Sequence, residues 1–258
     1  MNPDYESFYV TLPSNSSLQY YPDNVLSKFH VKLNAPLNLE GAWEVALAEI
    51  SYPNTVGNVL DNFEHKCVLL RRSTDQNPST VFVKPGKYTN SFEVCQQLNQ
   101  QQNIVEFLVN DSSSRVAVRT VDSNPVYIQF PGRLGLLLGF IPHHLYEVGD
   151  KIESEVSVDF TAGISHYFVY CNVCEPQMVG DAYAKLLRIL PRSEPMNSSS
   201  VVQRDYSNLH YLPIQKDKTI SVIRIDICLE DGSYVPFADI GKVIVVLHFR
   251  KRRQLHGY

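Results

Sequence analysis

The residues that most constrain this fold lie near the end of the chain, where two β-rich segments flank the dipeptide Asp231-Gly232. The first segment is residues 219–230 (TISVIRIDICLE), and the second is residues 233–250 (SYVPFADIGKVIVVLHFR). Asp-Gly between β-branched segments is typical of a tight hairpin, because glycine adopts the positive φ that a primed turn requires. The sequence therefore predicts two long strands joined by a two-residue turn.

The two segments differ in their hydrophobic pattern. In the first, Arg224 and Asp226 alternate with isoleucines, which is typical of a strand with one face toward solvent. In the second, residues 243–247 are apolar throughout. A continuous apolar strand is favoured where both faces are covered, so we expect a second sheet or a neighbouring subunit to cover it.

Composition bounds the class of protein. With 258 residues, 44% of them hydrophobic and 19% charged, the chain is long enough to bury a core. A formal net charge of −4 argues against a surface devoted to nucleic acid, since phosphate binding requires clustered Lys and Arg. No apolar stretch approaches the roughly twenty residues of a membrane helix. Residues 1–12 lack the pattern of a signal peptide, so we expect synthesis in the cytosol.

Strand patterns recur every eight to twelve residues or so, separated by Pro, Asn, Ser and Gly, which is typical of all-β sandwiches and barrels. Residues 58–150 differ, because they contain both predicted helices. We interpret them as an inserted, smaller α+β, β-rich domain, while residues 1–57 and 151–258 together form one sandwich. A strand is predicted at residues 155–160, within the second flank.

The two predicted helices have recognisable ends. The first covers residues 91–102, with Asn90 as the N-cap and with Phe92, Cys95 and Leu98 on one apolar stripe. The second covers residues 133–138 and stops at Gly139, since glycine adopts the left-handed conformation of a helix C-terminus.

No residue pattern predicts catalysis, a cofactor or a metal site. Cys171 and Cys174 have the spacing of metal ligands, but a structural zinc site requires four ligands and the sequence offers no second pair. Glu44 and Glu49 are five residues apart on one predicted strand, so we expect them on opposite faces and not as an acid–base pair. We therefore expect a protein that is not an enzyme.

Several motifs together resemble the minor capsid (penton) proteins of Polinton (Maverick) elements and related small DNA viruses. The flanking regions carry most of them, and residues 134–140 (LGLLLGF) match more loosely. The motifs are residues 7–17 (SFYVTLPSNSS), 20–24 (YYPDN), 29–33 (FHVKL), 39–53 (LEGAWEVALAEISYP), 211–214 (YLPI), 235–237 (VPF) and 241–250 (GKVIVVLHFR).

The resemblance implies a mainly β fold with a single jelly-roll β-sandwich, in a virion capsid subunit that forms pentamers at the vertices of an icosahedral shell. It also implies a separate double jelly-roll major capsid protein as partner. Length agrees with a single jelly roll, because at roughly 100 residues per sandwich the chain has room for one sandwich and the insertion.

Two features suggest further partners. The basic run Arg250, Lys251, Arg252 and Arg253 follows the last predicted strand and is a candidate contact with packaged DNA or an acidic partner inside the shell. A solvated chain end is the alternative. The insertion is a candidate site for contact with a host receptor.

Two other functions stay open at this stage. One is a β-sandwich module that binds carbohydrate or a receptor, since the chain holds 15 tyrosines, several of them near its start. Exposed aromatics also serve subunit interfaces, so tyrosine content does not separate the two. The other is a jelly-roll subunit at another position of a shell.

Overall fold

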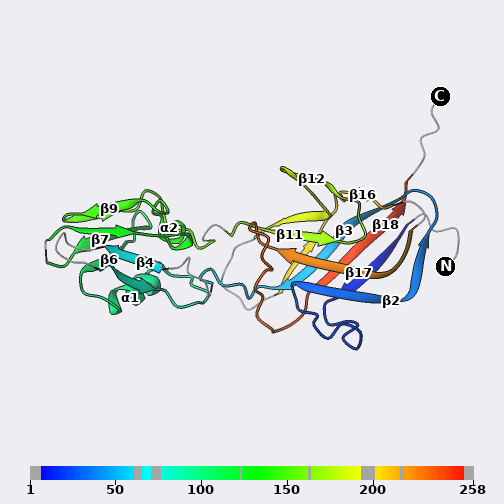
Figure 1. The fold of residues 1–258 in the computed structure, drawn as a ribbon, viewed down its shortest axis with the longest axis horizontal. Coiled ribbons are helices and arrows are strands. Elements are labelled where there is room, and N and C mark those ends of the chain that lie inside the picture. The colour runs from blue at the N-terminus through cyan, green and yellow to red at the C-terminus, as the bar shows by residue number, and fades with distance from the viewer. Residues whose placement is uncertain are drawn as a thin grey trace, which may run out of the picture. The chain divides into compact units, whose positions relative to one another are not determined.

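A computed structural model describes residues 7–60, 66–70, 77–122, 124–161, 164–192, 201–215 and 218–252, with only the backbone of residues 66–70. The fold is mainly β (Figure 1). The chain divides into two compact units, one made of residues 1–56 and 166–258 and the other of residues 57–165. We call them the sandwich unit and the inserted unit.

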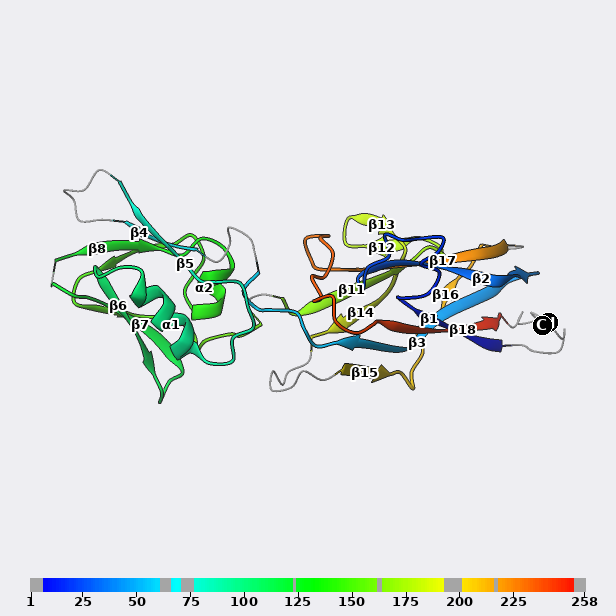
Figure 2. The same cartoon turned by 90° about the horizontal axis from the view of Figure 1, so that it is seen from below.

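The sandwich unit contains two antiparallel sheets. One has the order β1-β18-β3-β15, with β16 also on β3, and the other has the order β14-β11-β17-β2 (Figure 2). When the eight longer strands of this unit are numbered along the chain and its two- and three-residue strands are left out, the orders are 1-8-3-6 and 5-4-7-2, the arrangement of a jelly roll. The strands are β1 (Ser7–Pro13), β2 (Lys28–Leu39), β3 (Trp43–Pro53), β11 (His166–Cys171), β14 (Leu186–Pro191), β15 (Val201–Asp205), β16 (Leu212–Pro213), β17 (Lys218–Cys228) and β18 (Ile244–Lys251).

Alternating side chains of the two sheets build the core of the sandwich unit. On β18, Val245, Leu247 and Phe249 are fully buried, and on β17 Ile223 and Ile225 are fully buried. The side chains between them on β18 are partly exposed. The apolar segment is therefore covered on one face by the other sheet, while its second face is only partly covered by this chain.

The predicted terminal hairpin is wrong, because β17 and β18 lie in different sheets. A turn does form: the Gly232 N–H donates to Leu229 O (3.1 Å), and Gly232 has a φ of 82°. Asp231 does not have a positive φ, so the turn is not the primed type. β17 pairs with β11 on one side and with β2 on the other. The returning chain pairs only as far as Val235 before it crosses to the other sheet.

A short hairpin extends from the sandwich unit (Figure 1). Its strands β12 (Gln177–Val179) and β13 (Ala182–Ala184) pair with each other and with no other strand among the described residues. Met178 and Tyr183 lie directly opposite each other and are 70% and 75% exposed. An isolated two-stranded hairpin is marginally stable in water, so this element gains little support from its own chain.

The inserted unit packs two sheets and two helices around one core. The sheet orders are β5-β4-β8-β9 and β10-β7-β6. Leu98, Ile128, Phe130, Leu134 and Val118 are fully buried in this core. The elements are β4 (Lys66–Leu70), β5 (Ser79–Phe82), α1 (Ser91–Gln100), β6 (Val105–Asn110), β7 (Arg115–Thr120), β8 (Val126–Gln129), α2 (Arg133–Leu138), β9 (Leu145–Val148) and β10 (Lys151–Glu153).

The inserted unit ends at residue 165 in the structure. The sequence predicts that it ends at residue 150. The difference arises because β10 pairs with β7 of the same unit. Residues 155–160, predicted to be a strand, form no strand, and the Val158 N–H donates to Ser114 O (2.9 Å). This segment therefore closes the inserted unit.

Both predicted helices are confirmed. The side chain of Asn90 accepts a hydrogen bond from the Phe92 N–H (2.8 Å) at the start of α1. Gly139 ends α2 with a φ of 83°. Among the described residues, no helix has the length and apolar character needed to cross a membrane.

Candidate functional site

Arg250, the first of the basic residues selected from the sequence, lies inside β18 opposite Ser7 of β1 and Glu44 of β3. Its Nε donates to Glu44 Oε2 (3.0 Å), and its Nη2 lies 3.0 Å from the same oxygen. The guanidinium carbon lies 3.4 Å from the centre of the Tyr211 ring, a cation–π distance. The Arg250 side chain, although 46% exposed, is therefore held by contacts with other residues of the sandwich unit.

The other residues of the basic run differ in their surroundings. Arg252 Nε lies 3.8 Å from Glu44 Oε1, so two arginines share one carboxylate. Lys251 is exposed, and within the described residues it has no acidic partner. Arg253 lies outside the described residues. A contact through these residues stays a prediction, and Lys251 and Arg252 are the described side chains on which it depends.

Sequence reasoning missed an aromatic row on the outer face of the β1-β18-β3 sheet. Tyr9 stacks on His248 with ring centres 4.4 Å apart, and the hydroxyl of Tyr211 lies 2.6 Å from His248 Nδ1. Burial and the nearby positive charge of Arg250 lower the pKa of His248. The alternation of β18 places His248 on the same face as Arg250. That Tyr9 of β1 lies beside His248 becomes apparent only from the strand pairing.

The expectation that Glu44 and Glu49 lie on opposite faces is wrong. The pairing of β18 with β3 shifts register between Val246 and Leu247. This shift adds one residue to β3, so Glu44 and Glu49 lie opposite Arg250 and Val246, which share a face. They are still not an acid–base pair, because Glu44 binds the arginines and Glu49 accepts from Gln203 (3.2 Å).

Cys171 and Cys174 lie at the end of β11 and just beyond it, and both are buried. Burial raises the pKa of Cys171 to about 12 and that of Cys174 to about 11. The Cys174 thiol lies 3.3 Å from Cys171 O, which accepts its hydrogen bond. Such thiols stay protonated and inert near neutral pH, because the thiolate is the nucleophile and the metal ligand. No cluster of metal-ligating side chains occurs in the described part of the chain.

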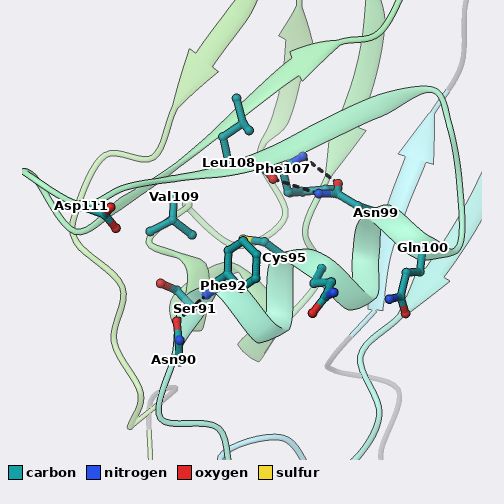
Figure 3. A pocket seen from close by; sticks show the side chains of 11 residues that line it. Asn90, Ser91, Phe92, Cys95, Asn99, Gln100, Phe107, Leu108, Val109 and Asp111 are labelled. Carbon is teal, nitrogen blue, oxygen red and sulfur yellow. Dashed lines mark hydrogen bonds between the residues drawn. The ribbon is translucent and has the colours of Figure 1, made fainter.

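A pocket lies between α1 and β6 of the inserted unit (Figure 3). Its volume is about 540 Å³, within the range of small-molecule sites. Figure 3 shows the Phe92 ring in front of the helix, near Val109 and between Ser91 and Cys95. The lining is formed by Asn90, Ser91, Phe92, Cys95, Gln96, Asn99, Gln100, Phe107, Leu108, Val109 and Asp111.

The prediction that Phe92 lies on the buried stripe of the first helix is wrong. The buried residues of α1 are Val94, Cys95 and Leu98, whereas Phe92 is 61% exposed. At 3.6 residues per turn, Phe92 lies about 120° around the helix from Leu98. Its ring is therefore left at the surface, where it lines the pocket.

Side-chain amides cover part of the free edge of β6. Asn99 Nδ2 donates to Phe107 O (3.0 Å), and Asn99 Oδ1 accepts from Phe107 N–H (2.8 Å). Gln102 forms the same pair of bonds with Val105, at 2.8 and 2.9 Å. In the sequence, the feature that corresponds to this covered edge is the amide-rich segment at residues 96–103 (QQLNQQQN). Its role is apparent only once the strand that follows it is known to lie at the edge of a sheet.

The two-sheet order and the inserted unit define a class of protein, a jelly roll with an insertion between its third and fourth strands. The crystal structure of the penton protein of mavirus is similar to this chain, with a TM-score of 0.58 and 14% sequence identity. The similarity covers 95% of this chain and 100% of the mavirus chain. The fold is therefore penton-like.

Neither sequence comparison identifies a relative. No protein-family model matches the chain, and no curated protein matches it.

Proposed function

We propose that this chain is a penton subunit of an icosahedral virion, related to those of Polinton elements and small DNA viruses, and that it forms pentamers at the vertices. The observation that carries the proposal is the likeness to the mavirus penton protein over both units. A role in structure, without enzymatic activity, accompanies it.

The surface of the sandwich unit supports association with other copies. A five-fold ring joins two different surfaces of each subunit, so exposed apolar side chains on one element meet a separate surface of the next copy. We assign the hairpin β12-β13 to one side of that contact, because Met178 and Tyr183 form an exposed apolar pair. Burial against a neighbour would also stabilise a hairpin that pairs with no other described strand of its own chain.

Mass in solution tests the pentamer. We expect light scattering after size-exclusion chromatography to give a mass that rises with concentration to five subunits, with five-fold rings in negative-stain images. Replacing Met178 and Tyr183 together by Ser should shift assembly to higher concentration. Val121→Ser is the matched control, since Val121 is 60% exposed but lies in the inserted unit. A monomer at every concentration, also when mixed with shell protein, contradicts the proposal.

Further partners follow from the proposed position in a shell. The vertex subunit would contact a separate double jelly-roll major capsid protein, and the exposed basic end of β18 would meet packaged DNA. Neutralising Lys251, Arg252 and Arg253 while keeping Arg250 tests the DNA contact, because Arg250 is paired with Glu44 and supports the fold. If purified particles of this variant contain as much genome as wild-type particles, the proposed DNA contact is wrong.

We also propose a function for the inserted unit. We propose that residues 57–165 form an inserted domain that folds independently and faces a host receptor. The compactness of each unit supports this proposal, as does the continuous core of the inserted unit. A stand-alone β-sandwich binding module is the second candidate, and the pocket beside Phe92 favours it; such a module would bind its ligand as a monomer.

A further inference from the structure

The edge strand of the inserted unit's smaller sheet has one open position. The order β10-β7-β6 leaves β6 paired on one side only. In an antiparallel pair, alternate residues direct their N–H and C=O toward the partner strand. Ile104 O accepts from Val121 N–H (3.1 Å), so the even-numbered residues face β7 and Val105, Phe107 and Val109 face the free edge.

Two of these three edge positions are filled by side-chain amides, that of Asn99 at Phe107 and that of Gln102 at Val105. Each amide replaces one residue of an absent neighbouring strand. The backbone N–H and C=O of Val109 have no such partner among the described residues, and Val109 lines the pocket beside Phe92. The pocket therefore presents one donor and one acceptor side by side.

The pocket surrounds this pair with a flat aromatic ring, amide side chains and one carboxylate, that of Asp111, which accepts hydrogen bonds and disfavours an anionic ligand. Phe92 offers an exposed aromatic face. The side chains of Gln96, Gln100 and Asp111 are exposed and make no hydrogen bond with other described residues. An amide both donates and accepts, so it suits a hydroxyl group in either orientation. The arrangement favours a neutral ligand rich in hydroxyl groups that also has an apolar face.

We propose that this pocket binds a neutral pyranose sugar. One ring hydroxyl accepts from Val109 N–H, its neighbour donates to Val109 O, the C–H face of the sugar packs on Phe92, and Gln96 and Gln100 bind further hydroxyls. An extended peptide fits less well, because Asn99 and Gln102 already occupy the next two edge positions and block strand addition beyond one residue.

Ligand-observed saturation-transfer NMR on the full chain tests the proposal. The probes are the methyl glycosides of glucose, galactose, mannose and N-acetylglucosamine, with sorbitol as a polyol that has hydroxyls but no ring face. We expect transfer to at least one glycoside and none to sorbitol. The proposal is overturned if none of the glycosides shows more saturation transfer than sorbitol. It is also overturned if a blocked tripeptide shows transfer and the glycosides do not.

Two variants locate the site. Phe92→Ala should weaken binding about tenfold through loss of the ring contact, while Phe82→Ala, which removes a ring that is 50% exposed elsewhere in the same unit, should not change it. Val109→Pro removes the N–H donor without removing a bond to β7, since that N–H faces the free edge. Equal binding by the wild type, Phe92→Ala and Val109→Pro overturns the assignment. The readout does not depend on oligomeric state, so it is separate from the test of the pentamer.

Discussion

Gly139, at the end of α2, is the residue whose replacement tests the packing of the inserted unit most sharply. Its φ is 83°, and a Cβ atom added there would lie 2.1 Å from Val156 O. The backbone of Val156 is held in place, because its N–H donates to Gly139 O (3.2 Å). The Gly139→Ala variant must therefore both adopt a left-handed conformation and displace a bonded backbone segment.

The cost has two parts. A left-handed conformation costs a non-glycine residue about 1–2 kcal/mol. Forcing extra volume into a packed region costs about 1–3 kcal/mol more. The free energy of unfolding of the inserted unit should fall by about 2–5 kcal/mol. For a domain of this size, the midpoint of thermal unfolding should fall by roughly 8–20 °C.

Two control variants separate the contributions. Gly232 has a φ of 82°, but a Cβ there meets nothing within 4 Å, so Gly232→Ala should cost only the conformational part, about 1–2 kcal/mol, and only in the sandwich unit. Gly149 lies in the inserted unit, has open space and lacks a positive φ. Gly149→Ala should therefore change stability by less than about 0.5 kcal/mol.

Differential scanning calorimetry of the full chain measures all three variants. If the two units unfold independently, Gly139→Ala lowers one transition and leaves the other in place. A loss for Gly139→Ala no larger than that for Gly232→Ala would refute the reasoning about the close approach to Val156. Equal shifts of both transitions would refute independent unfolding of the two units.

Three other predictions concern a buried amide, a partly exposed histidine and the buried thiols. Asn58 is fully buried and bonds both the N–H and the C=O of Tyr88 (2.8 Å each), so Asn58→Ala should cost about 2–5 kcal/mol in chemical denaturation. The folded-state pKa of His248 lies below 6.5, so its contribution to stability is present above pH 6.5 and is lost as pH falls below that value. His248→Gln should flatten this part of the stability–pH curve, and an unchanged curve would contradict the assignment. In a Cys67→Ser background, a thiol reagent should label the native protein far more slowly than the denatured one, since burial raises the pKa of the remaining thiols, Cys95, Cys171, Cys174 and Cys228.

The features that sequence patterns predicted well are those decided by local chemistry. Asn90 caps α1 because its side-chain oxygen reaches an N–H two residues along the chain. Gly139 ends α2 because it tolerates a positive φ. The alternation of Arg224 and Asp226 with buried isoleucines correctly indicated a strand with one buried face. None of these features depends on which strands become neighbours.

The terminal hairpin shows where local signals fail. Asp231-Gly232 does turn the chain, but the turn does not determine which strand pairs with β17. β2 and β11, which are far away in the sequence, occupy the two edges of β17, and the chain after Val235 leaves for the other sheet. A jelly roll requires this crossing, because its last two strands lie in different sheets.

The sequence did not reveal the candidate sites either, because they also depend on which strands pair. Glu44 meets Arg250 across 206 positions of sequence, in a register that a one-residue bulge in β3 sets. Val109 is open because β6 is an edge strand, and it is left as the one unfilled edge position of the three because Asn99 and Gln102 bond Phe107 and Val105. Residue type indicates what a side chain is able to bind, but strand register decides which partners it meets and which backbone groups are left for a ligand.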